Sequence, residues 1–159
     1  MQLLAYNVAM KLKSFDHMNC SLAQTLDVIG ERWTLLVLRD AFFGAKRFEQ
    51  FQKSLGIARN ILTTRLNRLV DEGILEKRAA KVGRFEYVLT AKGLELQPVL
   101  LAMTHWGDKH KPNPKGKRIV FVDRESGKPI QPMAVRAADG RVLAPREVKA
   151  KPGPGLKGA

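Results

Sequence analysis

The residues with the clearest chemical potential lie at positions 58–72, where apolar residues recur at helical spacing. On a helical wheel the leucines fall on one side, and a polar set falls on the other: Asn60, Thr63, Thr64, Asn67 and Asp71. Arg59 and Arg68 lie at the flanks of the polar side. Amides, hydroxyls and guanidinium groups hydrogen-bond base edges and phosphates in a DNA groove. On its own, however, the pattern is equally typical of a solvated amphipathic helix.

The neighbouring elements decide between these two interpretations. Periodicity predicts helices at 21–29, 33–43, 47–55 and 58–72, strands at 74–78 and 85–89, and a last helix from 91 to about 109. We expect Ser21 to cap the first helix and Thr90 to cap the last. A short turn around Gly56 joins the third and fourth helices. This order is that of a winged helix-turn-helix domain, a mainly α fold with a small β-hairpin wing.

The charge of the chain agrees with a nucleic-acid partner. The formal net charge is +13 and the isoelectric point is about 10.2, which favours a polyanion, either nucleic acid or an anionic membrane. Together with the element order, this predicts binding to double-stranded DNA. We expect base-edge contacts from Arg59, Asn60, Thr63 and Thr64, and phosphate contacts from Arg47, Arg68, Lys81 and Arg84. Arg59 lies at the edge of the polar side, where a phosphate contact is the alternative. The basic residues of the hairpin are nearly as typical of a turn kept soluble by charge.

Other function classes lack their sequence signals. We find no phosphate-binding glycine loop, no motif of paired catalytic carboxylates and no Ser/His/Asp or Cys/His signature, so we do not expect an enzyme. Three histidines and one cysteine have no metal-site spacing, and we expect neither metal nor cofactor. No apolar run is long enough to span a membrane, and the first nine residues do not have the form of a signal peptide. A cytoplasmic location is therefore expected.

Cys20 lies just before the first predicted helix. Helix N-termini carry partial positive charge, which in general favours the reactive thiolate form of a nearby cysteine. One hypothesis is therefore a redox or electrophile sensor. The alternative is a small residue packed at an interface between two copies, because free cysteine is among the most buried residue types.

The sequence from residue 19 to about 108 resembles the HxlR family of bacterial winged-helix regulators, which are related to the MarR group. The resemblance rests on Cys20, on GERW, on RF at residues 47–48, on RLVDEGIL, and on EYVLTAKG. It implies a homodimer formed by the first and last helices, palindromic operators, and repression or activation of nearby genes. It also implies that the cysteine corresponding to Cys20 senses quinones, aldehydes or oxidants in some members. Candidate dimer residues are Leu22, Leu26, Leu96, Leu100 and Trp106.

The domain division follows from composition. We expect an N-terminal extension at 1–19, the winged-helix and dimerisation domain at 20–110, and a basic β-rich appendage at 111–159 with a flexible end. The appendage has a net charge of +8 and two turns, ESGKP and AADGR. It resembles a zinc-ribbon-like segment without the cysteines, so metal binding is not expected.

The function predicted overall is a sequence-specific transcription regulator, with repression favoured over activation, that responds to a small molecule or an electrophile. The alternative is an architectural nucleic-acid-binding winged-helix protein that senses nothing.

Overall fold

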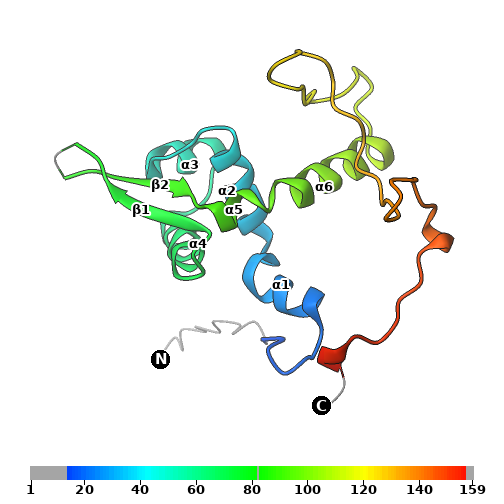
Figure 1. Ribbon diagram of the computed structural model, residues 1–159. Coiled ribbons are helices and arrows are strands. Elements are labelled where there is room, and N and C mark those ends of the chain that lie inside the picture. The colour runs from blue at the N-terminus through cyan, green and yellow to red at the C-terminus, as the bar shows by residue number, and fades with distance from the viewer. Residues whose placement is uncertain (1–13, 82, 157–159) are drawn as a thin grey trace, which may run out of the picture.

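The winged-helix order is confirmed in the computed structural model, which describes residues 14–81 and 83–156 (Figure 1). The elements of the main body are α1 (Ser21–Ile29), α2 (Arg32–Phe42), α3 (Phe48–Leu55), α4 (Arg59–Asp71), β1 (Leu75–Ala79), β2 (Phe85–Leu89), α5 (Ala91–Leu94) and α6 (Gln97–His110). The strands pair antiparallel, with Leu75 opposite Leu89 and Ala79 opposite Phe85. The fold is therefore mainly α with one hairpin, as the sequence predicts.

The core sits where α2, α3 and α4 meet the base of the hairpin. Its members are Ile29, Val37, Leu38, Phe51, Ile57, Leu62, Leu66, Leu69, Ile74, Leu75 and Tyr87. The three leucines of α4 are completely buried, as the helical wheel predicts. Burying a side chain of this size stabilises the fold by roughly 1.5–3 kcal/mol. Phe51 and Tyr87 meet edge to face, with ring centroids 6.5 Å apart, so α3 and the hairpin are held together.

Two local devices set the angles between elements. Gly56 follows α3 with a φ of 60°, a left-handed conformation that glycine adopts without strain, and its N–H donates to the Gln52 carbonyl. Thr90 caps α5 as predicted: its Oγ1 accepts from the Gly93 N–H at 3.1 Å and donates to the Gly73 carbonyl at 2.6 Å. Thr90 thereby ties the end of the hairpin to the end of α4.

Two details of the predicted helices are wrong. Cys20, not Ser21, is the N-cap of α1, and no side-chain hydrogen bond caps that helix. The single helix predicted at 91–109 is two helices, α5 and α6, which are separated at Glu95 and Leu96. Pro98 lies in the first turn of α6, where its missing N–H breaks no helical hydrogen bond, so it favours a helix start at this point.

Residues 111–156 form an open C-terminal segment. The two predicted turns are present, but each closes a single antiparallel bridge, Val122–Pro129 and Arg136–Val142, in place of the expected strands. Two short 3₁₀ turns follow, η1 (Pro145–Glu147) and η2 (Pro154–Leu156). Near the end of the described chain, the Gly155 carbonyl accepts from the Asn19 side chain at 3.0 Å, and the predicted flexibility of the chain end stays a prediction. Residues 1–13 and 157–159, also included in the predicted extensions, lie outside the described residues.

The start of this segment covers part of the body. Phe121 stacks on Phe43 with ring centroids 6.5 Å apart. Arg118 pairs with Asp108 of α6 at 3.8 Å. Residues of α2 and α6, together with Arg118, Ile119 and Phe121, line a mainly apolar cavity of about 480 Å³ that is open to solvent on one side.

The candidate dimer residues separate into two groups. Leu22, Leu26 and Trp106 are exposed at 67, 44 and 62%. Leu96 and Leu100 instead pack against the core of their own chain. Val99 and Met103 of α6 are exposed as well, so α1 and α6 both carry exposed apolar residues.

We predict that Gly93→Ala destabilises the fold by about 1–3 kcal/mol, because the added Cβ would overlap the Ile74 carbonyl oxygen. Gly107→Ala in α6 is the matched control. Its Cβ meets nothing within 4 Å, so a gain of about 0.4–1 kcal/mol is expected from the lower entropy of the unfolded chain. Urea unfolding measures both changes. Equal stabilities of the two variants would contradict the close approach of α5 to the hairpin base.

Candidate nucleic-acid interface

The first two turns of α4 present a polar face to solvent. Asn60, Thr63 and Thr64 are all exposed, because the buried leucines fix the opposite side of the helix. Thr63 and Thr64 donate their hydroxyl hydrogens to the carbonyls of Arg59 and Asn60, both at 2.9 Å. Their oxygens remain able to accept. The Asn60 amide makes no hydrogen bond within the described part of the chain, so both its donor and its acceptor are available.

A basic hollow of about 700 Å³ lies beside this face, between the starts of α3 and α4 and the hairpin. Its lining is Arg47, Phe48, Glu49, Gln50, Arg59, Lys77, Gly83, Arg84, Phe85 and Tyr87. Four cations and one carboxylate therefore face a common space. Such a concentration of like charge favours an anionic occupant.

The eight predicted contact residues are all exposed, but they do not form one cluster. The hollow brings together Arg47, Arg59 and Arg84. Asn60, Thr63, Thr64, Arg68 and Lys81 are not part of its lining. Arg68 pairs with Glu72 at 2.8 Å, and Arg47 lies 3.7 Å from Glu86. Both arginines are about half exposed and both carboxylates are partly exposed, so these ion pairs are weak and a phosphate could replace the carboxylate at little cost.

Arg59 is oriented by an aromatic ring. Its guanidinium lies over Phe48, 4.7 Å from the ring centroid. This stacking holds the group at the junction of the hollow and the polar face of α4. The position is compatible with either contact considered from the sequence, a base edge or a phosphate.

Sequence reasoning missed Lys77. Its Nζ lies 4.6 Å from the ring centroid of Phe85 and 5.9 Å from that of Tyr87. The strand register places Lys77 directly opposite Tyr87. The feature that points to Lys77 is the aromatic residue Tyr87 directly opposite it on the neighbouring strand. This pairing can be recognised only when the register of the two strands is known. Burial raises the pKa of Tyr87 above its ordinary value, so its hydroxyl stays neutral under physiological conditions.

The start of α3 is held firmly inside the hollow. The Gln50 side-chain oxygen accepts from the backbone N–H groups of Lys46 and Arg47, both at 2.9 Å. The Tyr87 N–H donates to the Lys46 carbonyl at 2.7 Å. These bonds fix the backbone of Arg47 relative to the hairpin.

Arg65 is a second residue that the sequence did not single out. Its guanidinium pairs with Glu31 at 2.6 Å, and only 19% of the Arg65 side chain is exposed. Glu31 is the N-cap residue of α2, so this pair links the polar flank of α4 to the core helix. The buried Arg65 Nε has no hydrogen-bond partner in the described chain. Arg65 therefore positions α4 and is not part of its exposed face.

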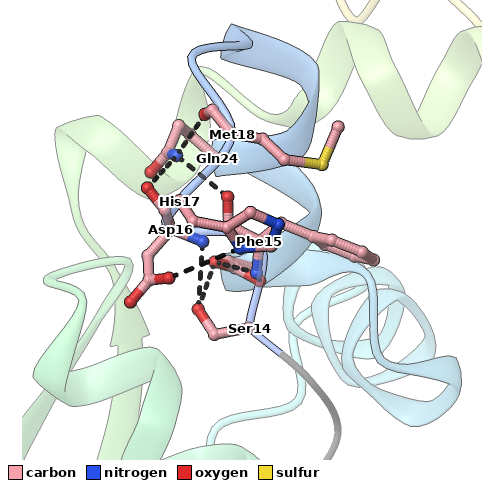
Figure 2. A network of polar contacts seen from close by, with 7 residues as sticks. Ser14, Phe15, Asp16, His17, Met18 and Gln24 are labelled. Atoms are coloured by element: carbon pink, nitrogen blue, oxygen red, sulfur yellow. Dashed lines mark hydrogen bonds and ion pairs between the residues drawn. The ribbon is translucent and has the colours of Figure 1, made fainter.

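Cys20 is exposed at the N-cap of α1. The residues just before it are tied to the helix, as Figure 2 shows. The Gln24 side chain donates to the Met18 carbonyl at 3.0 Å, while Asp27 accepts from the Ser14 hydroxyl and from the Phe15 N–H at 2.8 Å. Residues 14–18 therefore form a fixed turn that leaves the thiol accessible in the single chain.

Within residues 14–81 and 83–156, no helix is long and apolar enough to cross a membrane. The same residues contain no group of three or more side chains suited to hold a metal ion.

The profile of the HxlR-like helix-turn-helix family matches residues 28–115. An HTH-type transcriptional regulator of Mycobacterium tuberculosis, Rv3095, is 37% identical over 139 residues, which are 86% of this chain and 88% of that protein. The HTH-type transcriptional regulator YdeP of Bacillus subtilis is 37% identical over 62% of this chain and 79% of its own length.

Solved structures fall into a long and a short group. PA1607, a candidate transcription factor, is 42% identical and has a TM-score of 0.81, covering 87% of this chain and 99% of its own. The redox regulator HypR in its reduced form is 33% identical with a TM-score of 0.55, covering 58% of this chain and 94% of its own. The HypR structure matches a part of this chain about as long as its winged-helix body. The match with PA1607 extends well beyond a part of that length.

We predict that Glu31→Ala destabilises the fold by about 1–3 kcal/mol, because it leaves the largely buried Arg65 guanidinium without its carboxylate. Glu76→Ala is the control. It breaks a similarly close pair with Arg78, 2.8 Å apart, but both side chains are solvent-exposed, and no measurable loss is expected. Thermal unfolding of both variants makes the comparison, and an equal loss in the two would refute a positioning role for Arg65.

Proposed function

The chain belongs to the HxlR-like helix-turn-helix family of transcription regulators, and from this premise we propose that it represses genes as a homodimer bound to palindromic DNA. The observation that carries the proposal is the exposed amide and hydroxyl face at the start of α4, next to a hollow lined by four cations. We place this action in the bacterial cytoplasm.

The proposed binding mode divides the interface between base and backbone contacts. The start of α4 enters the major groove, where the free Asn60 amide can pair with an adenine edge and Arg59 with a guanine. Thr63 and Thr64 face the groove one turn later. Arg47, Arg68, Lys81 and Arg84 hold the phosphates on either side, and Lys77 joins them from the floor of the hollow.

The proposed dimer is sealed by the exposed apolar sides of α1 and α6. Leu22, Leu26 and Trp106 are the main candidates, since each is open to solvent in the single chain. Leu96 and Leu100 contribute indirectly, because they are partly buried residues whose packing against the core holds α6 in place. Two-fold symmetry then sets the two α4 helices about 34 Å apart, one turn of DNA. Residues 20–110 form the functional unit in this proposal.

A small-molecule effector would fit the cavity between α2, α6 and residues 118–121. Its volume of about 480 Å³ is in the range of ligand pockets, and most of its lining is apolar. The charged residues at its edge are paired: Arg118 with Asp108, and Arg39 with Asp40 at 2.6 Å. A neutral, apolar effector is therefore favoured over a charged one.

Asn60→Ala and Lys81→Ala should weaken DNA binding in different ways. Losing the Asn60 amide removes one base contact, so we expect a loss of about 1–3 kcal/mol on the operator, relaxed specificity at one base, and little change on scrambled DNA. Losing Lys81 should weaken both DNAs alike and reduce the slope of log K against log salt by about one unit. Sites selected from a random DNA library supply the operator, and fluorescence anisotropy across salt concentrations supplies the affinities.

Equal losses by both variants on both DNAs would contradict this division of roles. If the library selection yields no discrete palindrome and the protein binds DNA broadly with little sequence preference, the architectural winged-helix function is favoured instead.

Cys20 is proposed as the point at which an electrophile acts. Its thiolate can add to a quinone, or attack hydrogen peroxide, whose O–O bond breaks to give a sulfenic acid and hydroxide. The chain has no second cysteine, so a disulfide would require Cys20 of another copy. The redox regulator HypR is among the similar structures, which supports the proposal by analogy.

We expect a quinone or peroxide to weaken operator binding by the wild-type protein at least several-fold. Cys20→Ser should bind the operator as the untreated wild type does and lose the response. Mass spectrometry of the treated protein identifies the modified residue. An unmodified Cys20 after treatment would support the packing interpretation and refute sensing.

A further inference from the structure

The C-terminal segment follows a fixed path without a core of its own. Not one residue from 111 to 156 is buried. Beyond the contacts of Arg118 and Phe121, two hydrogen bonds tie the later part of the segment to the body: the Met133 N–H donates to His105 Nδ1 of α6 at 3.3 Å, and the Gly155 carbonyl accepts from Asn19 next to α1. Between these anchors it runs as a wide arc that stands away from the helices, drawn from orange to red in Figure 1.

Apolar side chains along this arc are only about half covered within the single chain. Met133, Val135, Val142, Val148 and Leu156 are exposed by 46 to 59%. Ordering a chain costs conformational entropy, and burial of apolar groups is the usual compensation. Within the single chain, residues 131–156 have only part of that compensation, which favours a second surface against which they pack.

The arc begins and ends at the helices that carry the exposed apolar surface of the body. One anchor is His105 of α6, the residue next to the exposed Trp106, and the other is Asn19, one residue before Cys20, the N-cap of α1. The segment with these exposed apolar groups is thus attached to the body next to exposed apolar residues of α6 and next to the start of α1. A single partner surface could cover both.

The comparison with known structures supports a fixed arrangement. Residues 20–110 are 91 of 159, or about 57% of the chain. The alignment with PA1607 covers 87% at a TM-score of 0.81, so it includes most of the C-terminal segment in a similar place. HypR is covered over 94% of its own length by 58% of this chain, and therefore lacks a counterpart of the segment.

We propose that residues 131–156 form an arm that packs against a second copy of this chain and extends the α1–α6 interface. The inference rests on the proposed homodimer and names a further part of it. In a two-fold dimer the arm of each copy would pack against the other copy, so the same apolar residues would be covered in both copies.

DNA is the alternative partner for the arm, because residues 111–159 carry a net positive charge. The exposed valines, Met133 and Leu156 have no favourable contact with phosphate, whereas they suit an apolar protein surface. Part of the positive charge is also already neutralised: Arg141 lies 3.3 Å from Glu147 and 4.0 Å from Asp139. The observations therefore favour a protein partner for the arm.

The test compares two double variants of the full chain by sedimentation equilibrium. Val135→Asp/Val148→Asp places charges on the apolar side of the arm, and we expect the dimer dissociation constant to rise at least tenfold. Lys149→Gln/Lys151→Gln is the matched control, since it removes two nearby charges and leaves the apolar residues, and it should dimerise at least as tightly as the wild type. A chain that ends at Ile130 should behave like the first variant, with an unchanged circular dichroism spectrum for the helices.

The outcomes separate the arm from the dimer itself. If the wild type dimerises and Val135→Asp/Val148→Asp dimerises equally well, the arm proposal is overturned and the homodimer stands. If the wild type sediments only as a monomer at micromolar concentration, the proposed homodimer fails first. If Lys149→Gln/Lys151→Gln loses affinity for DNA on all sequences while the apolar variant still dimerises normally, the segment is a DNA-binding arm and not a dimer arm.

Discussion

The complete burial of Leu62, Leu66 and Leu69 is the constraint on which the rest of the interface depends. Three leucines in one row fix the rotation of α4 about its own axis, because any turn of the helix would expose them at a cost of roughly 25 cal/mol for each Å² of apolar surface. The side opposite the leucines must then face solvent. Asn60, Thr63 and Thr64 lie on that side, so the exposed polar face is a consequence of the core.

The basic hollow follows from the same packing. Its four cations come from separate elements: Arg47 from the start of α3, Arg59 from the start of α4, Lys77 from β1 and Arg84 from the turn before β2. They share one space because the Phe51–Tyr87 contact and the Tyr87–Lys46 backbone bond hold α3 against the hairpin. Aromatic rings under Arg59 and Lys77 then fix where two of the charges lie without neutralising them.

The spacing of apolar and polar residues in the sequence predicts those structural features that depend on a single local segment of the chain. The leucine side of α4, the turn at Gly56 and the Thr90 cap are local in sequence, and the structure confirms them. The Arg65–Glu31 pair joins residues 34 positions apart, and Lys77 takes its meaning from the strand register, so neither is visible in a helical wheel. The break before α6 was missed although Pro98 marks it, because the apolar spacing of residues 91–109 continues across the break.

The positive charge of the chain couples DNA binding to formation of the proposed dimer. Two copies carry a net charge of +13 each and repel one another. An interface between them must therefore be formed by apolar groups, and exposed apolar side chains are present on α1, on α6 and in residues 131–156. DNA phosphates between the two copies would neutralise part of that repulsion. In the proposed complex, DNA binding and dimer formation therefore stabilise each other, and by thermodynamic linkage each must raise the affinity of the other by the same factor. Salt screens both the repulsion between copies and the attraction to DNA, so it should strengthen the free dimer while it weakens the complex.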